Sequence, residues 1–130
     1  MGVQKQLSVF LENKPGVLGR LCQSFADAKI NITALTISDT VDHAVVRLIV
    51  SDPRRAQDLL EQHGVLVVET DVLTLKLSNR PGALARLAEK LSDAKVNIEY
   101  AYGTAGSSAR ASLFVLRVSD LKKARRALKV

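Results

Sequence analysis

A 20-residue segment of the chain returns 66 residues later, and this internal duplication constrains the fold more than any other feature. Residues 13–32 and 79–98 are identical at 11 of 20 positions. Both copies begin with Asn-x-Pro-Gly-x-Leu-x-Arg-Leu and end with Asp-Ala-Lys-x-Asn-Ile. We therefore expect two structural repeats of the same kind, residues 1–70 and 71–130.

The composition of the 130 residues is that of a globular protein, because 47% are hydrophobic and 25% are charged. A single cysteine, Cys22, excludes an internal disulfide and a cysteine metal cluster. Neither a leader segment nor an apolar run of ~18 residues is present in the sequence, so a cytoplasmic protein without a membrane partner is expected.

Two apolar periodicities alternate along each repeat. Leu7, Val9 and Leu11 recur at every second position, as do the leucines of 73–77, and this predicts strands with one buried face. Each strand leads into an Asn-x-Pro-Gly loop. The apolar residues that follow lie on one helical stripe, from Val17 in the first copy and from Ala83 in the second.

The remaining elements complete a β-α-β-β-α-β order in the first repeat. Strand pairs are expected at 30–38 with 44–50, and at 96–103 with 109–118 across the loop 104–108. Asp52 and Asp120 are suitable N-caps for helices at 53–63 and 121–129, and 65–69 reads as a strand. This order predicts an α+β, ferredoxin-like fold with antiparallel sheets and helices on one face. The second repeat lacks its last strand.

This order of elements occurs together with two Asn-x-Pro-Gly-x-Leu loops and two Asn-Ile pairs. In these features the chain resembles a tandem pair of ACT domains, small modules that sense amino acids and related metabolites. The resemblance covers nearly the whole chain. Members of this family often carry a polar residue or histidine two positions before the loop asparagine. Leu11 and Leu77 stand there in this sequence.

The loops have the chemistry of a small-ligand site. Backbone N–H groups at a helix start bind carboxylates and phosphates, and glycine lets a ligand approach the backbone closely. Asn13 and Asn79 offer both donors and acceptors, although each could instead stabilise only its own turn. The predicted ligand-binding residues are Asn13, Pro15, Gly16, Val17, Leu18 and Asn31 in the first repeat, and Asn79, Pro81, Gly82, Ala83, Leu84 and Asn97 in the second.

The resemblance implies that two modules meet through their second strands, with ligand at the junction. Asn13 would then share a site with Asn97, and Asn79 with Asn31. Read without the family, Asn31 and Asn97 are ordinary turn residues that could adopt a left-handed conformation.

The sequence gives no sign of catalysis, a metal or a cofactor. His43 and His63 have no visible nucleophile or acidic partner, and no phosphate-binding loop is present. We therefore expect a non-enzymatic regulatory protein that binds a small amino acid and passes a change in shape or assembly to a partner enzyme or regulator. An alternative is a regulatory subunit of a biosynthetic enzyme.

A nucleic-acid-binding module is the less favoured alternative. Residues 1–70 hold 7 Lys/Arg and 8 Asp/Glu, whereas residues 71–130 hold 12 and 5, so the second repeat is strongly basic. Tyr100 and Tyr102 share a predicted strand face, but aromatic residues make up only 4% of the chain.

The missing last strand leaves an edge of the second sheet open. No linker separates the strands at 65–69 and 72–77, so we expect one long, bent strand over 65–77. Its first part would fill an open edge or pair with a second chain, and a homodimer is expected.

Overall fold

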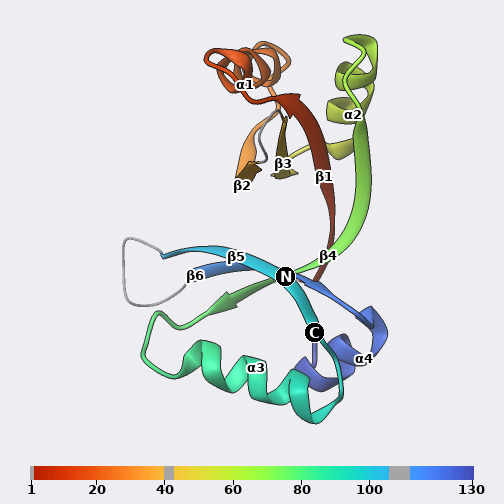
Figure 1. Ribbon diagram of the computed structural model, residues 1–130. Helices are drawn as coiled ribbons and strands as arrows, with labels where there is room; N and C mark the ends of the chain where they lie inside the picture. Colours follow the sequence, from red (N-terminus) through yellow and green to blue (C-terminus); the bar gives the residue numbers. More distant parts are fainter. Residues whose placement is uncertain (1, 40–42, 106–111) are drawn as a thin grey trace. The chain divides into compact units, whose positions relative to one another are not determined.

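The computed structural model describes residues 2–39, 43–105 and 112–130 (Figure 1). The chain forms two compact units. One consists of Lys5–Thr70 and the other of residues 2–4 together with Asp71–Val130. The elements are β1 (Gly2–Glu12), α1 (Val17–Asp27), β2 (Ile32–Asp39), β3 (His43–Val50), α2 (Pro53–Gln62), β4 (Val67–Leu77), α3 (Ala83–Asp93), β5 (Ile98–Ala105), β6 (Ser112–Val118) and α4 (Leu121–Leu128). The mixed α+β, ferredoxin-like repeat order expected from the sequence is confirmed.

In the Lys5–Thr70 unit the strand order is β2-β3-β1-β4. β1 pairs antiparallel with β3, and Leu7 lies opposite Leu48. The alternation that predicted β1 arises because every second side chain of the strand faces the helices. The core between sheet and helices consists of Leu7, Val9, Leu11, Leu21, Phe25, Ile30, Val46, Leu48, Val50, Ala56 and Leu60.

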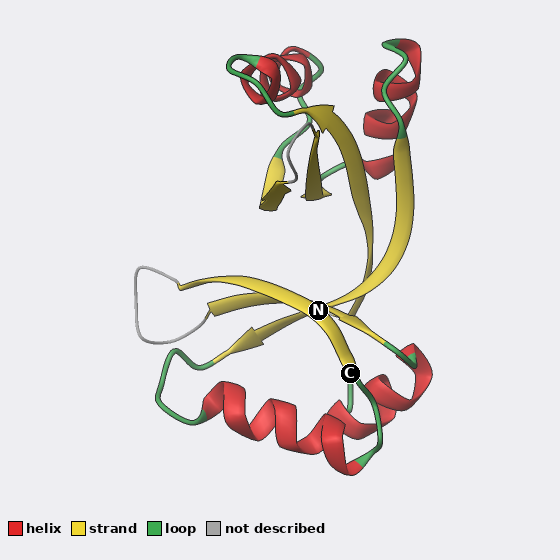
Figure 2. Cartoon of the chain, viewed as in Figure 1, coloured by secondary structure: helices red, strands yellow, loops and turns green. Residues whose placement is uncertain are grey.

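In the second unit the strand order is β1-β4-β6-β5, and α3 and α4 lie along the same face of the strands (Figure 2). β4 pairs antiparallel with β6, with Leu73 opposite Leu116. The core is Leu73, Leu75, Leu87, Leu91, Val96, Leu116, Val118 and Ala124, which repeats the pattern of the first unit.

β4 is one continuous strand of 11 residues that passes from the first unit into the second after Thr70. The single long strand expected over 65–77 is therefore observed, beginning two residues later. The edge beside its second half is filled by the first residues of β1. There the Thr74 hydroxyl, which is 1% exposed, donates a hydrogen bond to the Gly2 carbonyl at 3.3 Å. The apolar alternation begins only at Leu7, so it gave no sign of this role for residues 2–4.

The helix ends follow the expected capping chemistry with one difference. Asp52 and Asp120 cap α2 and α4 by accepting hydrogen bonds from the backbone N–H of Arg55 and Lys123, at 3.2 and 3.0 Å. The left-handed residue after α1 and after α3 is a lysine, Lys29 or Lys95, each with φ 60°.

The left-handed conformation suggested for the asparagines Asn31 and Asn97 is therefore wrong. In the Schellman arrangement the left-handed residue directly follows the C-cap, so the lysine adopts this conformation two positions before each asparagine.

Two predicted segments fall partly outside the described residues. The predicted loop 104–108 contributes Thr104 and Ala105 to β5, and its remaining residues are not described. β6 begins at Ser112, whereas the strand was expected from 109, and residues 109–111 are not described. Of the helices in the described ranges, none has the length and apolar character needed to cross a membrane.

Candidate functional site

The two Pro-Gly loops adopt the same backbone conformation. Gly16 has φ 88° and ψ −18°, and Gly82 has φ 89° and ψ −12°, so both glycines occupy the left-handed region. The carbonyl of each glycine accepts the first hydrogen bond of its helix at 3.0 Å, from the N–H of Arg20 or Arg86. The glycine therefore begins the helix without a side chain over its first free N–H groups.

An arginine lies over each of these glycines, and sequence reasoning did not select it. A Cβ atom built on Gly16 would lie 3.2 Å from Nη1 of Arg20, and one on Gly82 would lie 3.1 Å from Nη1 of Arg86. The guanidinium thus adds a positive charge beside the helix start, where the peptide dipoles already favour an anion. The signal was present in the sequence, because both arginines belong to the repeated motif.

A cavity of about 640 Å³ lies beside the first turn, and we call it the loop cavity. It is bounded by the end of β1, the turn, His43 and residues 64–66. Glu12 and Lys14 line it and form an ion pair at 2.8 Å. The hydrogen bond from Lys14 and its charge hold the pKa of the Glu12 carboxyl below its ordinary value.

A second cavity of about 510 Å³, the helix groove, lies between α1 and α2. Its lining includes the core residues Leu11, Leu21 and Leu60. The second unit has a cavity of about 380 Å³ at the corresponding place, lined by Ala83, Arg86 and Lys90 among others. Each Pro-Gly turn therefore has a space large enough for a small molecule next to it.

The predicted site residues occupy different environments. Asn13, Pro15, Asn79 and Pro81 are exposed in the turns. The side chains at the first helical positions, Val17 and Ala83, are partly buried and line the cavities. Leu18 packs against the core, whereas its counterpart Leu84 is 47% exposed.

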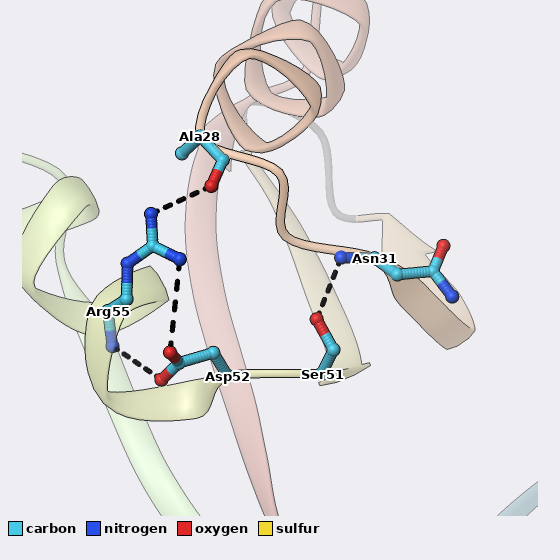
Figure 3. A network of polar contacts seen from close by, with 5 residues as sticks. All are labelled: Ala28, Asn31, Ser51, Asp52 and Arg55. Carbon is cyan, nitrogen blue, oxygen red and sulfur yellow. Dashed lines mark hydrogen bonds and ion pairs between the residues drawn. The ribbon is translucent and has the colours of Figure 1, made fainter.

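The backbone of Asn31 and Asn97 is fixed by a serine that directly follows the third strand of each repeat. The N–H of Asn31 donates to Ser51 Oγ at 2.9 Å, and the Ser51 N–H donates to the Asn31 carbonyl at 2.9 Å. Asn97 and Ser119 form the same two bonds at the same distances. The side chain of Asn31 points away from this network (Figure 3).

Arg55 connects the end of α1 to the start of α2 in the first unit. It donates to the Ala28 carbonyl at the end of α1 at 2.7 Å and lies 4.0 Å from the carboxylate of Asp52 (Figure 3). The serines were visible in sequence as the repeated Val-Ser-Asp, but nothing in the pattern linked them to the asparagines.

The loop asparagine and the second-strand asparagine of each repeat lie near opposite ends of their strands. β1 ends with Glu12 opposite His43, whereas β2 begins with Ile32 opposite Val50, at the other end of β3. His43 and Val50 are seven residue steps apart, which corresponds to roughly 23 Å of strand. In the second unit Leu77 lies opposite Ser112 and Ile98 opposite Val118, which gives roughly 20 Å. The structure therefore does not bring the loop asparagine and the second-strand asparagine of one repeat together.

Comparison with solved structures supports this reading of the fold. The chain is 40% identical to protein BT0572 from Bacteroides thetaiotaomicron, with a TM-score of 0.93 over 98% of this chain and 87% of that one. It is 18% identical to the regulatory subunit of aspartate kinase from Thermus thermophilus, with a TM-score of 0.71 over 99% and 96%. The corresponding Thermus flavus subunit gives 16% identity and a TM-score of 0.66 over 99% and 95%. At these lower identities the likeness to the kinase subunits shows the fold alone.

A comparison with curated proteins gives no match. The family model for the ACT domain pair matches residues 1–129. With the duplicated β-α-β-β order and the two identical Pro-Gly turns, this match establishes that the chain belongs to the ACT domain pair family.

Proposed function

We propose that this chain is a non-catalytic regulatory protein that binds a small amino acid at its Pro-Gly turns and transmits a change in shape or assembly to a partner. The observation that carries the proposal is the pair of left-handed glycines, each with an arginine and a cavity beside a helix start. This combination suits the carboxylate of an amino acid. An alternative is that the chain is an obligate regulatory subunit of a biosynthetic enzyme.

The site is proposed to be composite, with Asn13 of one module facing Asn97 of another, and Asn79 facing Asn31. Support comes from the roughly 20 Å between the asparagines of one repeat, because a small amino acid cannot span this distance.

β2 and β5 are each the edge strand of their unit, and Leu35 and Ile37 on β2 are 37% and 44% exposed. An apolar edge strand invites pairing. We propose that β2 of one copy pairs with β5 of a second, giving a homodimer.

A thermal-shift screen of the twenty amino acids tests ligand binding. A ligand at a hundred times its dissociation constant adds ~2.7 kcal/mol to the folded state, which raises the melting temperature by roughly several degrees. The matched variants Gly16→Ala and Gly82→Ala put a side chain over one turn each, and each should weaken one class of site. If no amino acid at millimolar concentration moves the melting temperature by a degree, the proposal is wrong.

A mixing experiment tests the composite site. Asn13→Ala and Asn97→Ala should each weaken binding by roughly 1.5–3 kcal/mol. If the sites form between two copies, a mixed dimer of the two variant chains contains one junction with intact Asn13 and Asn97, so mixing restores tight binding at part of the sites. Sites formed within a single chain would show no restoration. Sedimentation at micromolar concentration measures the dimer itself.

A further inference from the structure

The loop cavity and the helix groove of the first unit adjoin. Leu11, Val17, Arg20 and Val65 line both of them. The space beside the Pro15-Gly16 turn therefore continues between α1 and α2. A ligand held at the turn can therefore extend along the groove between the two helices.

Six of the residues that line the groove are apolar. Leu11, Leu21 and Leu60 are buried, and Val17, Leu59 and Val65 are partly buried and pack against the same core. Its volume of about 510 Å³ lies in the range of small-molecule sites, which are mostly apolar with a few polar groups that fix orientation.

The charges in the groove orient a ligand. Arg20 stands at the shared end, with its guanidinium over Gly16. Asp27 lines the other part of the groove, where the Gln23 amide donates to it at 2.8 Å. An anion is thus favoured at the turn and disfavoured beside Asp27, which argues against an acidic side chain in the groove.

The second repeat differs from the first at several residues that line its cavity. Its cavity keeps an arginine, Arg86, but Lys90 replaces Ser24 and Ala83 replaces Val17. Ala127 stands at the position of Leu59, and Leu128 and Val130 line the cavity. In the described part of the chain Lys90 forms no ion pair, so its charge disfavours an apolar side chain there.

We infer that the first repeat selects an apolar amino acid, whose carboxylate lies at the Pro15-Gly16 turn beside Arg20 and whose side chain occupies the helix groove. The inference rests on the proposed amino-acid binding and adds the ligand class. It also makes the two repeats different in specificity, although their turns are alike.

Titration calorimetry on the full chain with L-leucine, L-alanine, L-lysine and L-aspartate tests this inference. L-leucine should bind at least tenfold more tightly than L-alanine, because its additional carbons are buried in the groove. Ser24→Lys, which copies the second repeat, should weaken leucine binding at least tenfold. Ala26→Lys adds the same charge to an exposed position of α1 outside the groove and should change it less than twofold.

A second variant keeps the test independent of the added charge. Leu59→Ala also copies the second repeat and should weaken leucine binding by threefold or more, while leaving alanine binding unchanged. Tighter binding of L-alanine, L-lysine or L-aspartate than of L-leucine overturns the inference, as does leucine binding that Ser24→Lys leaves intact. In those cases amino-acid binding itself still stands. Failure of every amino acid to bind refutes both proposals.

Discussion

Two lysines hold backbone conformations that glycine adopts at lower cost. Lys29 and Lys95 follow the C-caps of α1 and α3 with φ 60°. In each repeat the helix ends with a Schellman hydrogen bond to the carbonyl five residues earlier. The Ile30 N–H donates to Phe25 and the Val96 N–H to Leu91, both at 2.9 Å. The left-handed conformation costs a residue with a Cβ roughly 1–2 kcal/mol.

Because a glycine at either site loses this strain, Lys29→Gly should raise the free energy of unfolding. The gain is about 0.5–1 kcal/mol once the greater backbone freedom of glycine in the unfolded chain is subtracted. Urea denaturation measures it, and Lys95→Gly should behave alike. Lys29→Ala is the matched control, since it removes the charge but keeps the Cβ, and it should give no gain. Equal stabilisation by glycine and alanine would mean that the charge matters and the backbone conformation does not.

At the scale of elements, the second hairpin has a close contact that the first lacks. Gly103 on β5 lies opposite Phe114 on β6. A Cβ on Gly103 would lie 2.6 Å from Cδ1 of Phe114 and 2.8 Å from the Leu113 carbonyl oxygen. The backbone oxygen cannot move aside as a flexible side chain can. The glycine is therefore required by packing in the sheet.

Gly103→Ala should lower the free energy of unfolding by about 1–3 kcal/mol, the usual cost of an overpacked contact. Chemical denaturation is the measurement. Gly19→Ala is the control: Gly19 lies in α1 with open space around its Cα, and the second repeat has Ala85 at this position. This control should stabilise the chain by about 0.5–1 kcal/mol. A neutral Gly103→Ala would show that β5 and β6 can separate locally at no cost.

The elements that the sequence predicted well are those with local signals. Alternating leucines located the second half of β4, and Asp52 and Asp120 located the starts of α2 and α4. The start of β1 could not be predicted, because residues 2–4 pair with a strand that follows some 70 residues later. The turns of the candidate site were visible as motifs. Its arginines belong to the same repeated motif, but its cavities depend on tertiary packing, which periodicity does not report.

At the scale of the whole molecule, β1 and β4 belong to both units. β1 changes unit between Gln4 and Lys5, and β4 between Thr70 and Asp71. The second unit therefore contains strand residues from both sides of the Lys5–Thr70 segment. The second repeat, read alone as 71–130, has no strand of its own for the edge beside Leu73–Leu77.

Deletion of residues 1–4 should expose that edge. We expect faster amide exchange along 73–77, a loss of about 2 kcal/mol from broken strand hydrogen bonds, and concentration-dependent association through the open edge. Hydrogen-exchange mass spectrometry and sedimentation measure these effects. Thr74→Val keeps the strand and removes only the hydroxyl bond to Gly2, so its cost should be smaller, near 1 kcal/mol. Unchanged exchange at 73–77 after the deletion would contradict the assigned role of residues 2–4.

The shared strand also sets an order of events during synthesis. At roughly 5–20 residues per second, the first four residues leave the ribosome about 4–15 s before the second half of β4 exists. During that interval the Lys5–Thr70 segment can complete its own sheet, while residues 2–4 have no partner strand. The hydroxyl of Thr74 then joins a carbonyl 72 positions earlier in the chain. The second unit is thus completed by residues that are made before the whole of the Lys5–Thr70 segment.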